Sequence, residues 1–329
     1  MKIYLLAAFG ALCSLSIAQQ PYSLKVKVAN FNGDKVYLYQ DNGNDVKKID
    51  STTVKDGSLT FAGTLSEPAL FFLAPAKQNP FLALFMEKGN IEANVDVVNP
   101  QTNTVKGSVP NDEFVQFLKE SQNGNNLEGA ANFVQKNPNS IVSVYMLQRL
   151  LLSQMEFADS KKLAAQISPS LSKTTYYREL TKKLDEMGRL EVGKVAPAFV
   201  MKDINGRDVS LESFRGKCLI IDFWASWCGP CRGESPNMVK LYEDFKAKGL
   251  EILGVSLDKD KTAWQKAIDS DKLVWTHISD LQYWNNAVAK LYRVNSIPQT
   301  YLLDKNGVII GKNLRGESLR EAVAKALNQ

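Results

Sequence analysis

The chain of 329 residues has little cysteine and histidine, with four cysteines and one histidine. No cysteine lies between Cys13 and Cys218, so the first half of the chain must fold by burying apolar side chains and not by disulfide bonds. A four-ligand zinc site would need a second cysteine pair beside Cys228 and Cys231, and His277 is the only histidine. The composition therefore predicts no metal and no cofactor, and it leaves Cys228 and Cys231 as the redox element.

Long apolar runs and charge of one sign are also scarce. After the first 18 residues, no segment is apolar over the roughly 20 residues that a membrane-spanning helix needs. The 40 basic and 35 acidic residues are interspersed and give a net charge of +5, so no basic stripe for nucleic acid is expected. The length and the 44% hydrophobic content are typical of a globular chain with two or three domains.

The first 18 residues have the pattern of a secretory signal peptide. Lys2 precedes an apolar run from Ile3 to Ile17, and Ser16-Ile17-Ala18 offers a cleavage site with small residues, so the mature protein is predicted to begin at Gln19. Cleavage would leave the protein in the periplasm or another extracytoplasmic compartment, where disulfides persist. Cys13 is the one candidate for lipid anchoring, but Leu12 is larger than the residue such sites prefer, which favours a soluble product.

Residues 19–109 are predicted to form strands. The segment from Leu24 to Val28 alternates apolar and polar side chains, as half-buried strands do. Turn signals such as Asn42-Gly43 and Asp56-Gly57 separate the apolar segments. Regular short strands of this kind predict a small antiparallel, all-β sandwich-like domain.

Residues 110–191 are predicted to form a helical connector. Phe114 and Phe117 recur at helical spacing, and so do Val144 and Leu147 after a break. Gly193 lies at the end of this region. The predicted organisation is a signal peptide at 1–18, a β domain at 19–109, a helical connector at 110–191 and a further domain at 192–329.

A short apolar strand leads into the two cysteines of this last domain. Leu219 to Ile221 is typical of a buried parallel strand, and Cys228 then opens a helix. Residues three apart on a helix lie about 5–6 Å apart, which suits a disulfide between Cys228 and Cys231. Free N–H groups and the helix dipole favour a thiolate at Cys228, while Cys231 is expected to be more shielded. Cys228 is thus the predicted nucleophile and Cys231 the resolving thiol.

The same stretch resembles thioredoxin, whose motif WCGPC follows a strand. Asp222 lies six residues before Cys228, where thioredoxins carry a buried carboxylate, and Pro236 lies where they carry a helix-kinking proline. Ile297-Pro298 is similar to the cis-proline segment that faces the dithiol in this fold. The resemblance covers residues 192–329 and implies a C-terminal α/β thioredoxin fold.

Glu234 points to a narrower group of thioredoxin-like proteins. It lies three residues after Cys231, as in the extracytoplasmic TlpA/ResA-like thioredoxins. The region before the connector resembles an uncharacterised β-rich domain that often precedes such thioredoxins in some Gram-negative bacteria, and this likeness implies no catalytic residues. The implied function is an exported thiol-disulfide oxidoreductase in a multidomain chain.

Asp222 and Glu234 are the candidate proton acceptors. Asp222 follows an apolar strand, and burial raises the pKa of a carboxyl group, so it can take the proton of Cys231. Glu234 can share this role or tune the pair through its charge. Cys218 begins the same strand and is predicted to be a small buried side chain without a redox role.

Five residues are predicted to line the substrate site. Trp227 should shield the dithiol and line the docking surface. Gly229 and Pro230 form the dipeptide that reducing thioredoxins carry between their cysteines. Pro298 should follow a cis peptide bond, which would expose the backbone beside Ile297 to a substrate strand.

Three classes of function remain open. The preferred class is a reductase of protein disulfides. The expected partners are exported protein thiols, either those of apocytochrome c or those of misbridged exported proteins, and a membrane protein that donates electrons. A peroxiredoxin would carry proline and threonine where this chain has Ile221 and Ala225. A binding or assembly module with secondary redox chemistry is the third class, suggested by the large N-terminal region.

Overall fold

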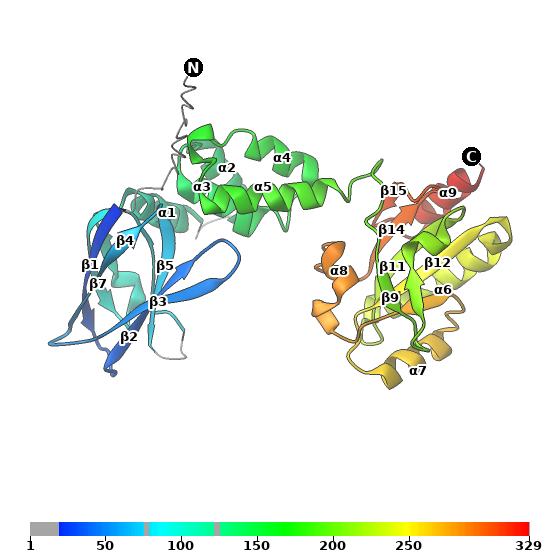
Figure 1. Cartoon of the computed structure of the whole chain (residues 1–329), viewed down its shortest axis with the longest axis horizontal. Coiled ribbons are helices and arrows are strands. Elements are labelled where there is room, and N and C mark those ends of the chain that lie inside the picture. Colours follow the sequence, from blue (N-terminus) through cyan, green and yellow to red (C-terminus); the bar gives the residue numbers. More distant parts are fainter. Residues whose placement is uncertain (1–19, 76–78, 122–125, 329) are drawn as a thin grey trace, which may run out of the picture. The chain divides into compact units, whose positions relative to one another are not determined.

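The computed structural model describes residues 20–75, 79–121 and 126–328. The chain divides into two compact units, Met1–Thr181 and Lys182–Gln329, whose elements are labelled in Figure 1. The predicted signal peptide at 1–18, with Cys13, lies outside the described residues. Among the residues described, none of the helices has the length and apolar character needed to span a membrane.

The strands described in the first unit form two four-stranded sheets, in the orders β4-β1-β7-β8 and β3-β2-β5-β6. The alternation predicted from Leu24 to Val28 is present in β1, where every second side chain is buried. The strands are β1 (Gln20–Ala29), β2 (Lys35–Asp41), β3 (Val46–Thr53), β4 (Ser58–Leu65), β5 (Ala69–Pro75), β6 (Leu82–Met86), β7 (Gly89–Asp96) and β8 (Thr104–Lys106).

The prediction of a purely antiparallel domain is wrong at one pair of strands. β1 runs antiparallel to β4 on one side but parallel to β7 on the other. Alternating apolar residues show which face of a strand is buried, and this pattern is the same for either direction of the neighbouring strand. The sequence therefore predicted the strands but not this pairing.

Five helices follow: α1 (Val109–Ser121), α2 (Asn126–Lys136), α3 (Ile141–Met146), α4 (Phe157–Ala164) and α5 (Thr175–Gly188). Several of them pack on the second sheet through aromatic rings. Phe85 of β6 lies 5.3 Å from Phe114 of α1 and 5.4 Å from Tyr145 of α3, between ring centroids. The Tyr176 hydroxyl of α5 accepts a 3.0 Å hydrogen bond from the Leu70 amide of β5. These helices and strands therefore share buried contacts.

The second unit is built on a five-stranded sheet of order β13-β12-β11-β14-β15, with β11 in the centre. β11 is parallel to β12 and antiparallel to β14. A small hairpin of β9 and β10 precedes the sheet. The elements are β9 (Val200–Lys202), β10 (Asp208–Ser210), β11 (Cys218–Trp224), α6 (Gly229–Phe245), β12 (Leu250–Ser256), α7 (Lys261–Asp271), β13 (Thr276–Ile278), α8 (Ala287–Leu291), β14 (Gln299–Leu303), β15 (Ile309–Lys312) and α9 (Gly316–Leu327).

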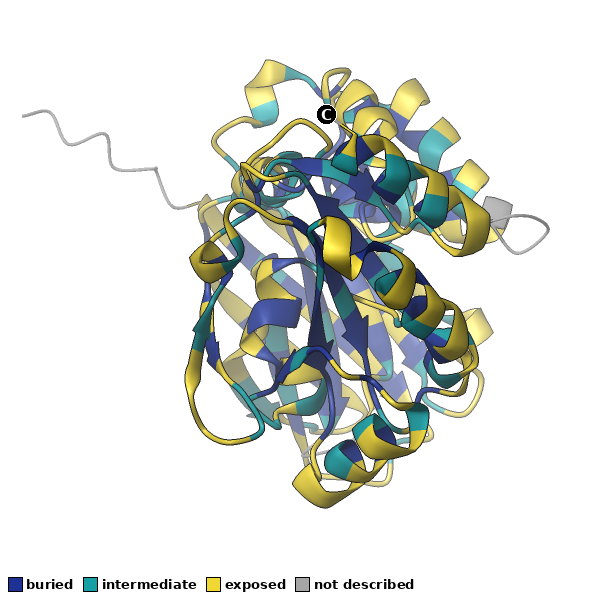
Figure 2. Ribbon diagram, turned by 90° about the vertical axis from the view of Figure 1, so that its right-hand side faces the viewer, coloured by how far each residue is buried: buried dark blue, intermediate teal, exposed yellow. Residues whose placement is uncertain are grey.

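This arrangement is the predicted thioredoxin fold. The central strand β11 leads directly to α6, and β14 and β15 form an antiparallel hairpin before the last helix α9. Figure 2 shows the sheet strands largely dark blue and the outer faces of the helices yellow. β11 is buried along almost its whole length, which fixes the end of the strand where the cysteine motif begins.

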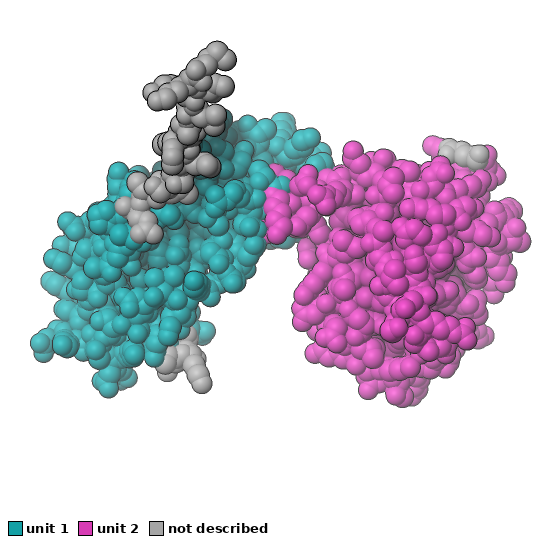
Figure 3. Space-filling view, viewed as in Figure 1, with its two compact units in different colours: residues 1–181 teal, residues 182–329 magenta. Residues whose placement is uncertain are grey.

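The tryptophans are distributed unevenly between the two units. All five belong to the second unit, which is magenta in Figure 3. They are Trp224, Trp227, Trp264, Trp275 and Trp284.

Candidate active site

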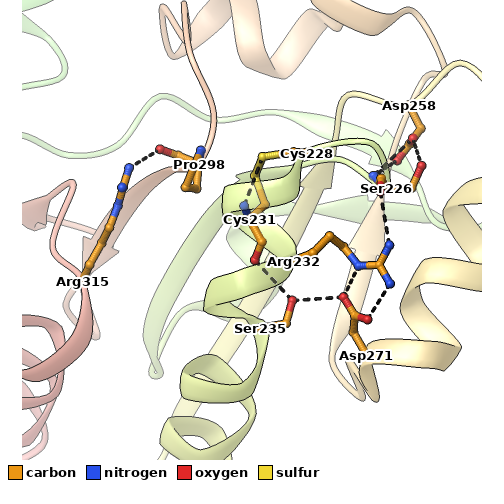
Figure 4. The surroundings of a disulfide bond; sticks show 9 residues. All are labelled: Ser226, Cys228, Cys231, Arg232, Ser235, Asp258, Asp271, Pro298 and Arg315. Atoms are coloured by element: carbon orange, nitrogen blue, oxygen red, sulfur yellow. Dashed lines mark hydrogen bonds and ion pairs between the residues drawn. A yellow bond between two sulfur atoms is a disulfide. The ribbon is translucent and has the colours of Figure 1, made fainter.

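Cys228 and Cys231 form a disulfide at the start of α6, with their Cα atoms 5.3 Å apart (Figure 4). Cys228 is the N-cap of the helix, and the Cys231 amide donates to its Sγ at 3.2 Å. Gly229 and Pro230 are the first helical residues, where proline fits because its missing N–H would have no helical partner. The exposed fractions are 4% for Cys228 and 6% for Cys231, so both cysteines are buried in the oxidised form and it does not show Cys231 as the more shielded one.

A small cavity of about 20 Å³ lies behind Cys231. Its polar wall contains the predicted residues Asp222 and Glu234, together with Arg315, which the sequence analysis missed. Pro298 also borders it. The rest of the lining comes from Trp224, Ser235, Met238, Leu273, Trp275, Thr300, Leu314 and Leu319. The fold thus brings Cys231 and two carboxyl groups to one partly enclosed space.

Asp222 has a strongly altered acidity. Burial on β11 is the main cause that raises the pKa of its carboxyl group to about 7. The negative charge of Glu234 raises this pKa further, and the Arg315 guanidinium opposes both. A carboxyl group with this pKa exchanges its proton near neutral pH, which suits a general base.

The start of α9 supports the segment around Pro298. The Ile297–Pro298 bond is cis, as predicted. Arg315 donates to the Pro298 carbonyl oxygen at 2.6 Å, and the Gly316 amide donates to Glu234 Oε1 at 3.3 Å. Arg315 therefore connects the cis-proline segment with the cavity that holds both carboxyl groups.

A second polar group lies on the other side of the dithiol (Figure 4). Ser226 donates from its amide and hydroxyl to the buried Asp258 carboxylate. Arg232 donates to the Ser226 carbonyl oxygen and to Asp271. The sequence analysis missed this group as well. In the sequence, only the place of Arg232 directly after Cys231 points to this polar group.

Three aromatic rings form a rim beside Cys228. The Trp227 side chain, predicted to line a docking surface, is 46% exposed. Its ring centroid lies 5.1 Å from Tyr283 and 6.0 Å from Trp284. Lys259 places its Nζ 4.4 Å from the Tyr283 centroid, a cation–π contact.

Cys218 and His277 are both buried. Burial raises the pKa of the Cys218 thiol to about 11 and lowers that of His277 to about 3. A thiol with this pKa is a poor nucleophile at neutral pH. Cys218 is therefore the inert side chain that the sequence predicted.

Comparison with known proteins finds matches in both units. Residues 192–312 match the AhpC/TSA family. Residues 22–114 match a domain of unknown function (DUF4369). The second unit is thus a thioredoxin-like domain with a cysteine pair in CXXC spacing.

The similar proteins are thiol-disulfide oxidoreductases. The thiol-disulfide oxidoreductase ResA of Bacillus thuringiensis subsp. konkukian is 33% identical over 141 residues, which are 43% of this chain and 79% of that protein. ResA of Geobacillus kaustophilus is 35% identical over 133 residues, covering 40% of this chain and 75% of that protein. The thioredoxin domain of a thiol-disulfide oxidoreductase from Bacteroides vulgatus is 39% identical, covering 42% of this chain and 99% of its own, with a TM-score of 0.40.

The chain belongs to the ResA-like family of thiol-disulfide oxidoreductases. It is an enzyme of thiol-disulfide exchange, with protein thiols and disulfides as the class of substrate. The relatives favour this function over that of a peroxiredoxin.

Proposed function

We propose that the protein is an exported reductase of protein disulfides in which Cys228 attacks and Cys231 resolves. The observation that carries the proposal is the Cys228–Cys231 disulfide at the start of α6, with a cavity behind Cys231 that Asp222 also lines. The helix start favours a thiolate at Cys228 once the disulfide is reduced.

The reaction transfers two electrons from the dithiol to a substrate disulfide. The Cys228 thiolate attacks one substrate sulfur, forming a mixed disulfide and releasing the other substrate sulfur as a thiolate, which takes up a proton. Cys231 then gives its proton to Asp222 and attacks Cys228 Sγ. This second step forms the Cys228–Cys231 disulfide and releases the second substrate thiolate, so the substrate is reduced to a dithiol.

Asp222 is the proposed general base of the second step. Its pKa of about 7 allows it to accept a proton and to return it at neutral pH. Glu234 raises the proton affinity of Asp222 through its charge and lines the same cavity. The two carboxyl groups therefore have different proposed roles, one in proton transfer and one in tuning.

The proposed docking surface surrounds the exposed Trp227 ring. Gly229 and Pro230, directly after Cys228, are proposed to contact the substrate as well. The backbone at Ile297 and Pro298 is proposed to pair with an extended substrate segment, because strand addition supplies binding energy without demanding one sequence.

We also propose an extracytoplasmic location and an external source of electrons. The leader at residues 1–18 has the features of a signal peptide, and the mature chain would comprise domains at 19–109, 110–191 and 192–329. In an oxidising compartment, each reduction leaves the enzyme as a disulfide, so a membrane protein must restore the dithiol. Apocytochrome c is the proposed substrate among exported proteins with cysteine pairs.

Trapping with two matched variants tests this function. Cys231→Ser removes the resolving thiol, so mixed disulfides with substrates should accumulate on non-reducing gels of the exporting host. Cys228→Ser removes the attacking thiol and should trap few or none. Equal trapping by both variants, or more by Cys228→Ser, would overturn the assigned order of attack. A trapped set without apocytochrome c would reject that substrate alone.

A further inference from the structure

The Arg232 guanidinium connects three segments around the dithiol (Figure 4). Its Nε and Nη2 both donate to the Asp271 carboxylate at the end of α7. Nη1 donates to the Ser226 carbonyl oxygen at 3.2 Å, and Nη2 also donates to Ser270 Oγ at 2.7 Å. Arg232 thereby ties the loop that precedes Cys228 to the end of α7.

Further hydrogen bonds hold the same segments. The Ser226 amide and hydroxyl donate to Asp258 at 3.0 and 2.6 Å, which fixes the loop from its other side. Ser235 Oγ donates to the Cys231 carbonyl oxygen at 3.3 Å and to Asp271 at 3.2 Å. The residues before and after the cysteine pair therefore belong to one network.

Arg232 and Asp271 differ from an ordinary surface ion pair. Exposed pairs contribute about 0–1 kcal/mol, because water screens them and their side chains lose freedom. Here the contact is two-pronged and the Asp271 side chain is only 15% exposed. The hydrogen bond from Arg232 is the main cause that lowers the pKa of Asp271. Such geometry makes the pair stronger and more directional.

We propose that Arg232 and Asp271 are positioning residues that stabilise the reduced dithiol by holding Cys228 at the start of α6. In the oxidised protein the Cys228–Cys231 bond itself keeps Cys228 in place. Reduction breaks this bond, and the N-cap position of Cys228 then depends on the loop before it. The network therefore contributes more to the reduced form than to the oxidised form.

The sign of the effect follows from this difference. Weakening the network destabilises the reduced form more than the oxidised form, so the equilibrium moves toward the disulfide. It also raises the pKa of the Cys228 thiol, because a displaced sulfur loses the helix N–H groups that favour the thiolate.

Glutathione equilibria of the full chain test the proposal. Arg232→Gln and Asp271→Asn should each shift the equilibrium about tenfold toward the disulfide, which is about 30 mV for a two-electron couple. The double variant should shift it about as far as either single one, because both residues act through one network. Thiol alkylation and mass spectrometry give the fraction reduced.

A charge effect predicts a different result. Removing the Arg232 charge alone would also favour the disulfide, but removing the Asp271 charge would favour the dithiol, and the double variant would return to the wild-type value. An opposite sign for Asp271→Asn, or wild-type equilibria in both single variants, overturns the proposal.

Arg320→Gln is the matched control. Arg320 of α9 forms an ion pair with Asp244 of α6. Its side chain is 35% exposed, close to the 32% of Arg232. The control should leave the glutathione equilibrium unchanged, whatever it does to the thermal midpoint. Ser226→Ala, a smaller change that removes one hydrogen bond to Asp258, should shift the equilibrium in the same direction by less. An equal shift in Arg320→Gln would show that any loss of stability moves the glutathione equilibrium, and it would reject the positioning role.

These measurements need no protein substrate. A failure of the positioning proposal would therefore leave the proposed reductase function intact, and failed trapping by Cys231→Ser would leave the glutathione result valid.

Discussion

Carboxylates flank the dithiol in two contrasting environments. On the cavity side, none of the hydrogen bonds found among the described residues ends on the Asp222 carboxylate, and its pKa is raised to about 7. On the other side, the Asp258 and Asp271 carboxylates accept several hydrogen bonds from Ser226 and Arg232. A buried carboxyl group that accepts no hydrogen bonds has a raised pKa and takes up a proton easily. The hydrogen bond from Arg232 instead lowers the pKa of Asp271, and this carboxylate holds its neighbours in place. Asp222 is thus suited to proton transfer, and Asp258 and Asp271 are suited to positioning.

The largest expected effect is on the reduction potential. Glu234, and Asp222 when it is ionised, place negative charge on the cavity side, which opposes a thiolate and thus the reduced form. The wild-type potential should lie at roughly −270 to −200 mV, whereas a strong oxidant of this fold lies at about −120 mV. The gap of roughly 80 to 150 mV corresponds to about 4 to 7 kcal/mol. Equilibration in glutathione buffers measures the value, and a potential above about −150 mV would mean an oxidase or isomerase.

Asp222→Asn should slow resolution of the mixed disulfide more than its formation. The asparagine cannot accept the proton of Cys231, and general base catalysis contributes about 10²–10⁴-fold. Stopped-flow reduction of insulin, quenched with acid at intervals, follows the lifetime of the mixed disulfide. Unchanged resolution would move the base role to Glu234 or to water.

The free energy of unfolding of the oxidised protein should depend on pH through Asp222. Its pKa is about 7 in the folded protein against 3.8 in the reference state, so between these values the folded state binds more protons. Stability is therefore lost as pH rises from about 4 to 7, by on the order of 4 kcal/mol at 1.36 kcal/mol per unit. Denaturant unfolding at several pH values should show this slope in the wild type and lose it in Asp222→Asn. Parallel curves would mean that Asp222 is ionised across the whole range.

The smallest effects should have opposite signs. Glu234 raises the pKa of Asp222 and Arg315 lowers it, so Glu234→Gln should move the pH midpoint of resolution down and Arg315→Gln should move it up. Both groups are partly solvated, so each shift should be below about one pKa unit. The pH profile of the resolution rate in the two variants tests the pair. Shifts in the same direction would point to a change in loop position instead of charge.

The parts of the fold and site that could be predicted depend on local pattern. The apolar strand, the helix opened by Cys228 and the segment at Pro298 are contiguous motifs, and all of them appear in the structure. The raised pKa of Asp222 follows from its place on a buried strand, which the sequence also displays.

The missed features depend on contacts between distant segments. Asp271 lies 39 residues after Arg232, and Arg315 lies 17 residues after the carbonyl that it binds. Neither residue belongs to a pattern, because a single charged side chain has many potential partners. The parallel pairing of β1 with β7 was missed for a related reason, since side-chain alternation carries no information on strand direction.

The uneven placement of the tryptophans has a spectroscopic consequence. Since all five belong to the second unit, emission excited at wavelengths selective for indole reports on that unit alone. The first unit can unfold without changing this signal, although its strands and helices contribute to the far-ultraviolet circular dichroism. Comparing the two signals therefore tells whether the two units melt together or separately.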